Sequence, residues 1–480
     1  MKKFKKSALL LCAISSIAAL SSCGGKKNDE NTIYFWHTFG KEIINELEKQ
    51  VNAFEKAVYK RDGVSISIEL SYQGGYDDLR NKVLKGYATG NTPTITVAYP
   101  DHIADYLELE NKKGDFVVNL DDYINSSEYG LGVKDEIFKE ETNVSDIVES
   151  FYEEGTKYKY EGTYSMPLMK STEIMLYNKD IVSSALSDLG IQKDVEKYMK
   201  NISWDEFEIL LKQIANNFER YGIKGDKGEE PYALFYDSDA NLFITQCYQR
   251  GIDYVSMKDG KGSIDFNNDK AVELLTEFKN MHEANLLTTK GANGGKYGSD
   301  AFKSMKCAFV VGSTGGSGYS DPGENFNPGV CKFPTYKNVS EEKQKYVSQG
   351  VTLGLLKNSS IREEVDNKKN RYGWEFIKYI TSPTNNVNLT MQSQGYVPVR
   401  KSAYETEDYK LLLDSTDYSA EVAKTVINEI NGNYFNYPVF KGSAEARNQS
   451  EGAVKQVLLG KLSPEDALKE AYKEAIKRTQ

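Results

Sequence analysis

Histidine is scarce in this sequence, with only three among the 480 residues. His37, His102 and His282 stand in unrelated contexts and no H-E-x-x-H pattern occurs, which argues against a zinc hydrolase. The most glycine-rich stretch, 312–318, contains no G-x-S-x-G, and no G-x-x-x-x-G-K-[ST] phosphate-binding loop is present. The 70 acidic residues still leave open a carboxylate pair for glycoside hydrolysis, because only distance identifies such a pair.

Cysteine is also rare, and its five positions exclude a disulfide framework. Cys12 and Cys23 lie at the N-terminus, which leaves Cys247, Cys307 and Cys331 for the folded part. An odd number of thiols allows one bridge at most, and Cys307 with Cys331, both on apolar strand-like runs, is the plausible pair. We expect three reduced, buried thiols instead. No Cys/His spacing indicates a metal site.

After the N-terminus, no stretch is apolar enough to span a membrane. Residues 1–22 combine four lysines with a short apolar run over 7–20, as in a signal peptide. Leu20-Ser21-Ser22-Cys23-Gly24 looks like a bacterial lipobox, in which Cys23 is lipidated, although an ordinary signal peptide with a chance cysteine is the alternative. We therefore expect a lipid-anchored protein on the extracytoplasmic face of the cell membrane, with 23–31 as a flexible tether.

Positive charge is in deficit. Removing residues 1–22 removes four lysines and no acid, which takes the formal net charge from −10 to −14. Nucleic acid needs a basic surface to meet its phosphates, so a nucleic-acid partner is not expected.

Strand-like and helix-like patterns alternate after the tether. Residues 32–37 form a β-run, and 44–58 carry apolar residues at the three- and four-residue spacing of a helix. Alternation over 64–70 predicts a second strand, 79–87 a second helix and 95–98 a third strand. This order implies an α/β fold with a parallel, doubly wound sheet. Ligands bind at the carboxyl ends of such strands, where Trp36-His37, Tyr72 to Tyr76 and Tyr99 to His102 arrive.

The middle of the chain is more helical, and its length predicts a second lobe. Ser203-Trp204-Asp205-Glu206 is a capping box that starts a helix with a buried apolar face. Further β-runs are predicted over 307–311, 330–333 and 351–356.

Several motifs together resemble the family of extracellular solute-binding lipoproteins that feed carbohydrate ABC importers. They are Ile33-Tyr34-Phe35-Trp36-His37, Thr89-Gly90-Asn91-Thr92-Pro93, Met166-Pro167, Tyr177-Asn178-Lys179-Asp180, Gly395-Tyr396-Val397-Pro398 and Gly460-Lys461-Leu462-Ser463-Pro464. Within this family, the chain is most similar to members that bind sn-glycerol 3-phosphate. The resemblance implies a two-lobed periplasmic-binding-protein fold with hinge crossovers, no cofactor, a monomer, and an ABC permease as partner. It places 32–145 with 308–358 in one lobe and 146–307 with 359–480 in the other.

The resemblance also implies a set of ligand-binding residues. Tyr76, Ser171, Ser313, Gly350, Tyr396 and Arg447 match the family's residue types, and Tyr236 takes the place of an aromatic platform. Pro100 stands where relatives have a glutamate for the glycerol hydroxyls, so the adjacent Asp101 is the candidate there. Serine, tyrosine and a backbone amide suit an anion, and Arg447 can form a bidentate fork with phosphate.

Three functions stay open from the sequence. The first is a binding protein for glycerol 3-phosphate or a glycerophosphodiester. The second is the same kind of protein adapted to a neutral sugar or oligosaccharide, in which aromatic rings stack on the sugar. The third, of another class, is a secreted carbohydrate-active enzyme.

Overall fold

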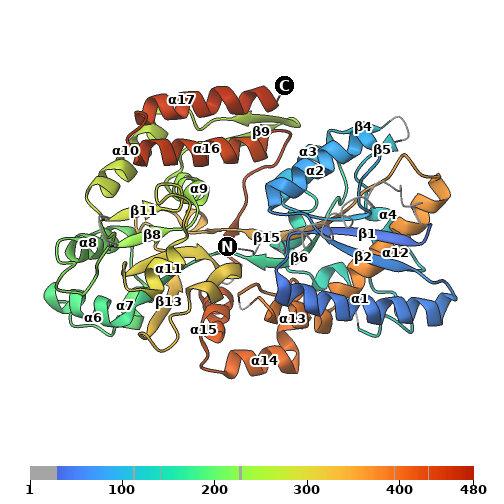
Figure 1. Cartoon of the computed structure of the whole chain (residues 1–480), viewed down its shortest axis with the longest axis horizontal. Coiled ribbons are helices and arrows are strands. Elements are labelled where there is room, and N and C mark those ends of the chain that lie inside the picture. Colours follow the sequence, from blue (N-terminus) through green and yellow to red (C-terminus); the bar gives the residue numbers. More distant parts are fainter. Residues whose placement is uncertain are drawn as a thin grey trace, which may run out of the picture.

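The computed structural model describes residues 30–111, 114–140, 142–225, 230–393, 395–430 and 432–479. The expected signal peptide, Cys23 and the tether up to residue 29 lie outside these ranges. Two lobes, each built on a five-stranded sheet with helices on its faces, make up the protein (Figure 1). The predicted two-lobed α/β fold is confirmed.

The first lobe contains the βαβαβ unit that the sequence predicted. Its sheet has the order β2-β1-β3-β15-β6, and β1 runs parallel to both β2 and β3. The strands are β1 (Thr32–His37), β2 (Ser67–Tyr72), β3 (Ile95–Ala98), β15 (Gln349–Leu355) and β6 (Met166–Ser171). The sheet is mixed, because β15 pairs antiparallel with β3 and with β6.

Apolar periodicity explains the packing of the first lobe. Leu47, Val51, Phe54 and Val58 of the first helix are buried, as the three- and four-residue spacing predicts. Helices from the C-terminal half of the chain cover the same core, with Trp374 fully buried. The helices of this lobe are α1 (Lys41–Asp62), α2 (Tyr76–Thr89), α3 (Pro100–Leu107), α4 (Asp121–Ile124), α12 (Glu363–Ile380) and α13 (Pro383–Met391).

The second lobe has a sheet of order β11-β8-β12-β7-β13. Its strands are β7 (Glu173–Asn178), β8 (Leu234–Tyr236), β11 (Leu287–Thr289), β12 (Phe309–Ser313) and β13 (Pro328–Lys332). Its helices are α6 (Lys179–Asp188), α7 (Val195–Lys200), α8 (Trp204–Ala215), α9 (Asp239–Arg250), α10 (Asp269–Glu283), α11 (Gly298–Lys303), α16 (Ser443–Leu458) and α17 (Pro464–Ala475). The capping box is confirmed at α8, where the Ser203 amide donates to the Glu206 carboxylate at 3.0 Å.

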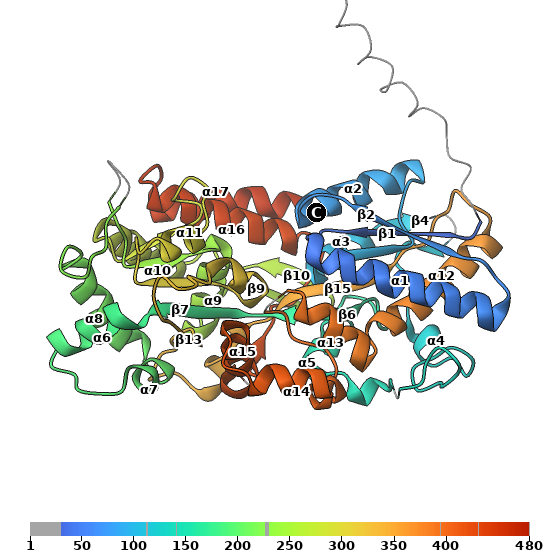
Figure 2. The ribbon, with the colours of Figure 1, turned by 60° about the horizontal axis from the view of Figure 1, so that its bottom comes forward.

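Shorter elements complete the described chain. They are α5 (Glu149–Glu153), α14 (Glu407–Asp414), α15 (Tyr418–Lys424), β4 (Glu110–Asn111), β5 (Gly114–Asp115), β9 (Val255–Lys258), β10 (Lys261–Ile264), β14 (Tyr346–Val347), β16 (Tyr434–Phe435), the 3₁₀ turns η1 (Val144–Asp146), η2 (Thr314–Ser320), η3 (Glu341–Lys343), η4 (Lys401–Glu405) and η6 (Ile476–Arg478), and the π-turn η5 (Thr425–Ile430). Figure 2 shows α14 and α15 beneath the junction of the lobes, with α16 and α17 on the opposite side.

The chain crosses between the lobes three times. Thr172 separates β6 of the first sheet from β7 of the second, and Ser348 separates β14 from β15. The third crossing follows α13, pairs Val397 with Lys170, and returns through β16 to α16. The first two crossings are joined where Thr172 Oγ1 donates to the Val347 carbonyl at 2.8 Å. The third lies beside them, because the Ser348 amide donates to the Phe435 carbonyl at 3.0 Å.

The predicted division into lobes needs correction. Segment 308–358 was assigned to the first lobe, yet β12 and β13 belong to the second sheet, where both pair with β7. Segments 146–307 and 359–480 were assigned to the second lobe, yet β6 lies in the first sheet and α12 packs on the first core. Strand pairing over long sequence separations decides membership of a sheet, and a linear pattern of elements does not contain it.

Cys247, Cys307 and Cys331 are free thiols and buried, which confirms the expectation of three reduced cysteines. Across the described ranges, no helix combines the length and apolarity needed to cross a membrane.

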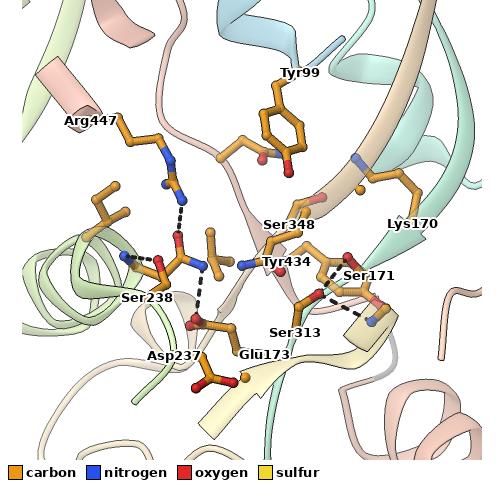
Figure 3. Close-up of a pocket in the computed structure, with 18 of the residues that line it drawn as sticks. Tyr99, Lys170, Ser171, Glu173, Asp237, Ser238, Ser313, Ser348, Tyr434 and Arg447 are labelled. Carbon is orange, nitrogen blue, oxygen red and sulfur yellow. Dashed lines mark hydrogen bonds between the residues drawn. The ribbon is translucent and has the colours of Figure 1, made fainter. Parts of the chain in front are cut away.

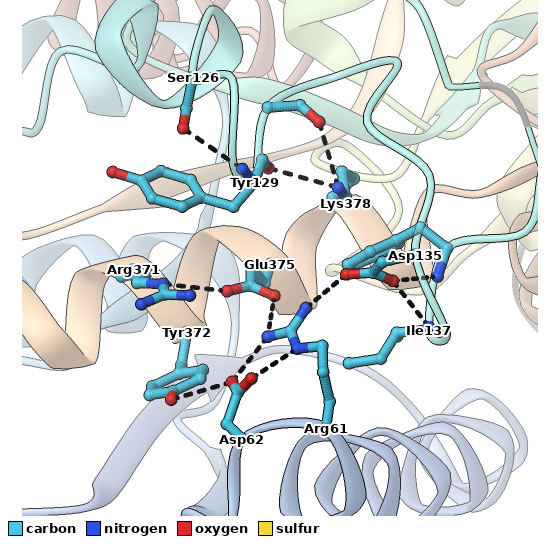
Figure 4. A network of polar contacts seen from close by, with 12 residues as sticks. Arg61, Asp62, Ser126, Tyr129, Asp135, Ile137, Arg371, Tyr372, Glu375 and Lys378 are labelled. Atoms are coloured by element: carbon cyan, nitrogen blue, oxygen red, sulfur yellow. Dashed lines mark hydrogen bonds and ion pairs between the residues drawn. The ribbon is translucent and has the colours of Figure 1, made fainter.

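A charged network fastens the end of α1 to α12 and to the loop over 125–140 (Figure 4). Arg61 pairs with Asp62 at 2.8 Å, with Asp135 at 2.7 Å and with Glu375 at 2.6 Å. Glu375 is fully buried and also accepts a bond from Arg371 Nε at 3.2 Å. Buried charges persist only when they are paired in this way, so the network fixes α12 against α1.

Candidate functional site

A cavity of about 1650 Å³ lies between the two lobes. The first lobe contributes Tyr76, Tyr99 and Asp101 to its wall, and the second lobe contributes Asn241 and Arg447. Figure 3 shows Tyr99 and Arg447 on opposite sides of the cavity. Its floor is formed where the chain crosses between the lobes, by residues that include Lys170, Ser171, Ser348, Gly350 and Tyr434. Movement of one lobe against the other would therefore change the shape of this cavity.

The structure brings together most of the residues that the sequence analysis proposed as a site. The cavity is lined by Tyr76, Asp101, Ser171, Ser313, Gly350, Tyr396 and Arg447. Tyr236 is the exception, because its side chain is fully buried and does not reach the cavity. Its hydroxyl donates to Glu173 at 2.5 Å and its ring packs edge-on against Phe333. Tyr236 therefore supports the cavity wall from behind and is not a platform within the cavity.

Two tyrosines form a stacked pair on the first lobe. Their rings, Tyr76 and Tyr99, have centroids 4.1 Å apart and an angle of 21° between planes. Tyr76 is the first residue of α2 and Tyr99 immediately precedes α3, so both rings are positioned where strands end and helices begin. Thr38 adds the first strand's loop to the same wall. The three predicted loops at the carboxyl ends of β1, β2 and β3 all reach the cavity. Of the residues that bound these loops in the prediction, Tyr76 and Tyr99 line the cavity, whereas Trp36, His37, Tyr72 and His102 do not.

Serine hydroxyls and close-packed glycines form the wall beside the crossings. Ser313 Oγ donates to Ser171 Oγ at 3.3 Å and accepts from the Gly315 amide at 3.2 Å. A Cβ at Gly315 would lie 2.6 Å from the Tyr396 ring, so glycine is needed for that ring to pack there. Gly350 has φ +101°, and a Cβ on it would lie 2.3 Å from the Met169 carbonyl oxygen. Both glycines serve contacts within the protein.

A chain of hydrogen bonds runs along the second lobe's wall (Figure 3). Arg447 Nη2 donates to Asn241 Oδ1 at 2.6 Å, and Asn241 Nδ2 donates to Glu173 Oε1 at 2.9 Å. Glu173 Oε2 then accepts from Tyr236. The residues come from α16, α9, β7 and β8, so the tertiary fold alone assembles them.

Burial dominates the electrostatics of the carboxyl groups. Burial raises the pKa of Glu173 to about 7, against the opposing effect of the Tyr236 and Asn241 hydrogen bonds. Burial likewise raises the pKa of Asp237 to about 6. It also raises the pKa of Asp101, where Arg447 and Arg80 favour the charged form. Such carboxyl groups act as strong hydrogen-bond acceptors when ionised and as donors when protonated.

Residues 49–416 match the family described as bacterial extracellular solute-binding protein. The chain belongs to this family. No curated protein matches the sequence of this solute-binding protein.

Solved structures share its fold over nearly the whole chain. The GacH receptor of Streptomyces glaucescens, solved free and with acarbose, is 18% identical with a TM-score of 0.67, over 93% of this chain and 98% of that one. UgpB from Mycobacterium tuberculosis in complex with glycerophosphocholine is 17% identical with a TM-score of 0.66, over 93% and 98%. The substrate-binding protein Lmo0181 from Listeria monocytogenes, in complex with cycloalternan, is 18% identical with a TM-score of 0.66, over 93% and 97%.

Sequence reasoning missed Glu173 and Asn241 in this solute-binding protein. A signal for Glu173 was present, because it is the one charged residue in the buried strand β7. A carboxylate that opens a buried apolar strand is costly, which makes it a candidate for a functional role. Asn241 gave a weaker signal, since a polar residue in the first turn of a helix is common.

Sequence reasoning also missed a buried ion pair at the crossings, formed by Lys170 and Glu154. Both side chains line the cavity floor, and Lys170 Nζ donates to Glu154 Oε2 at 2.5 Å. In the described part of the chain, no group of three or more His, Cys, Asp or Glu side chains is arranged to hold a metal.

Proposed function

We propose that this solute-binding protein captures a carbohydrate-type solute between its two lobes and delivers it, as a monomer, to an ABC importer. The observation that carries the proposal is a single cavity lined by side chains from both lobes. A ligand that contacts both walls stabilises the closed arrangement relative to the open one. The importer would then distinguish the loaded protein from the empty one by shape, and no covalent step is required.

The chemistry of the wall suits a sugar. The stacked Tyr76 and Tyr99 offer an aromatic surface for the apolar face of a sugar ring. Asp101 and Asp237 supply carboxyl groups that can bond to hydroxyls around the ring. At about 1650 Å³, the cavity exceeds the ~300–1,000 Å³ of typical small-molecule sites, which favours an oligosaccharide. Acarbose and cycloalternan in structures of the same fold support this class.

A glycerophosphodiester or glycerol 3-phosphate is the second candidate ligand. Arg447 favours it, because a guanidinium on the cavity wall can bind a phosphate in a bidentate manner. The relative solved with glycerophosphocholine supports it as well. Against it, Arg447 already donates to Asn241 and faces the carboxyl groups of Asp101 and Glu451, which compete for its charge.

Thermal unfolding with a panel of solutes tests the proposal. A ligand present at 100 times its dissociation constant stabilises the folded state by ~2.7 kcal/mol, which raises the melting temperature. Maltotriose or a longer glucan producing this rise, with glycerophosphocholine inactive, supports the sugar. The reverse pattern, abolished by Arg447→Ala, supports the phosphodiester.

Two results would overturn the proposal. The first is an absence of any shift across sugars and polyol phosphates. The second is release of reducing ends from maltotriose during incubation, because it would restore the carbohydrate-active enzyme as the explanation. The variant Glu474→Gln, on the surface of α17, serves as the control that leaves every ligand response unchanged.

We also propose that Cys23 carries a lipid anchor. The lipobox-like sequence at Cys23 supports it, and the extracellular family assignment agrees with export. In cells, Cys23→Ser should release the protein into the medium, whereas retention of that variant on the membrane would contradict the anchor.

A further inference from the structure

We propose that Glu173 is a positioning residue, which holds the Arg447 guanidinium in place on the cavity wall by acting through Asn241. Its relation to the ligand rests on the proposed function and on a contact between the bound solute and Arg447, which lines the cavity. The structural link between Glu173 and Arg447 is independent of any ligand.

The contacts form an unbroken chain from the second lobe's core to its surface. Glu173 is 3% exposed and Asn241 is 2% exposed, so water does not compete for their hydrogen bonds. The Asn241 amide connects the other two side chains, at 2.6 Å to Arg447 and at 2.9 Å to Glu173. Asn241 lies in the first turn of α9, and the side chain of Ser238, which caps this helix, accepts from the Asn241 backbone amide at 3.1 Å.

The orientation of the Asn241 amide is the central point. An amide has one accepting and one donating end. Arg447 can only donate, so the Asn241 oxygen must face it and the Asn241 nitrogen must face Glu173. Glu173 stabilises this orientation because its carboxylate oxygen accepts from the nitrogen end of the amide. With an acceptor of lower charge at position 173, the bond at the nitrogen end of the amide is weaker, and the oxygen is held less firmly toward Arg447.

Glu173 has few other partners that could take over this role. Tyr236 donates to its second oxygen from behind, and the charged groups that face it are Arg447 from α16 and Asp237 from the end of β8. Asp237 has a separate partner, since it accepts from the Gly298 amide at 2.7 Å. Arg447 is therefore the cation that offsets the Glu173 charge, and the amide between them couples the two.

The coupling gives the site a dependence on pH. The pKa of Glu173 is raised to about 7, so the carboxyl group is ionised above that pH and protonated below it. A protonated Glu173 is a weaker acceptor for the Asn241 amide, which loosens Arg447. The hold on a solute at Arg447 is therefore strongest above pH 7.

The first test needs no ligand. Chemical denaturation at pH 8 of the purified protein and of Glu173→Gln, Arg447→Met and the double variant gives the coupling between positions 173 and 447. Repeating the cycle with Asn241→Leu as the background removes the connecting amide. Coupling that is present with Asn241 and lost with Leu supports the proposal. Coupling that is absent in both, or equal in both, overturns it.

The second test measures binding of maltotriose and of glycerophosphocholine between pH 5.5 and 8.5. Whichever probe binds, Glu173→Gln should weaken it about five- to tenfold at pH 8 and flatten its rise in affinity between pH 6 and 8. In the Asn241→Leu background, Glu173→Gln should cause no further loss of affinity. An additive loss of affinity would show that Glu173 contacts the solute directly, and would overturn the proposal. Glu474→Gln is the matched control. Failure of both probes, together with the absence of a shift across the whole solute panel, contradicts the proposed function, and the first test then decides the link between Glu173 and Arg447 by itself.

Discussion

Lys170 donates to Glu154 at 2.5 Å at the point where the chain passes between its lobes. The same carboxylate accepts from Ser348 at 2.5 Å and from Asn436 at 3.0 Å. Lys170, Ser348 and Asn436 belong to the three different crossings, so a single buried side chain joins all of them. Because the crossings must bend when the lobes move, this joint lies where closure is controlled.

Removing one partner of this joint should be costly. Lys170→Met leaves Glu154 buried without its cation, for which a loss of about 3–5 kcal/mol in unfolding free energy is expected. The double variant Lys170→Met/Glu154→Gln should recover part of that loss. Urea denaturation measures both. The more exposed pair Lys179–Glu196 provides the control, and an equally large loss for Lys179→Met would contradict the role of burial.

Tyr76→Ala should weaken sugar binding about tenfold. The substitution removes one ring of the stacked pair that is proposed to hold the apolar face of the sugar, and an aromatic contact contributes about 0.5–1.5 kcal/mol. Calorimetric titration with the sugar found in the solute panel measures the change. Tyr72→Ala is the control, because Tyr72 is 64% exposed and lies outside the cavity. Equal losses in both variants would show that the stacked pair has no special part in binding.

Glu173 should make the protein less stable as pH rises from about 4.5 to about 7. In this window the folded state keeps the proton, because burial raises the pKa of Glu173 from 4.5 to about 7, while the unfolded state releases it. The difference amounts to about 3 kcal/mol of unfolding free energy, which is lost by pH 7 and constant above it.

The measurement compares the wild type with Glu173→Gln by denaturation at pH 5 and pH 8. Asp237, with its pKa raised to about 6, contributes in the same direction, so the informative quantity is the difference between the two proteins. If the unfolding free energy of the wild type and that of Glu173→Gln change by the same amount between pH 5 and pH 8, the raised pKa of Glu173 is contradicted.

Arg61→Met should lower the unfolding free energy by about 3 kcal/mol. The substitution deprives the fully buried Glu375 of its nearest cation, at 2.6 Å, and leaves Arg371 at 3.2 Å (Figure 4). Thermal unfolding measures the loss of stability. The substitution should leave sugar affinity unchanged, because no residue of the network lines the cavity. The surface pair of Arg220 with Asp188 supplies the control, because Arg220→Met should leave the midpoint of thermal unfolding unchanged.

Local patterns in the sequence determined the individual elements. The apolar spacing of α1 and the capping box of α8 depend on residues within one or two turns, and both were predicted correctly. The βαβαβ order predicted the parallel pairing of β1 with β2 and β3, and the tyrosines at the ends of these strands. These features could be predicted because their causes lie within a few neighbouring residues.

Tertiary structure alone decided the composition of the second lobe and of its cavity wall. Sequence placed Tyr236 in the site, yet the pairing of β8 between β11 and β12 turns its ring into the core. Asn241 forms hydrogen bonds with Glu173, which is 68 residues away in the sequence, and with Arg447, which is 206 residues away. Such contacts form only after strands and helices have packed, because no local pattern specifies which distant polar group will satisfy a buried one. Local sequence thus determined the individual helices and strands, whereas the tertiary fold determined which residues contact one another in the site.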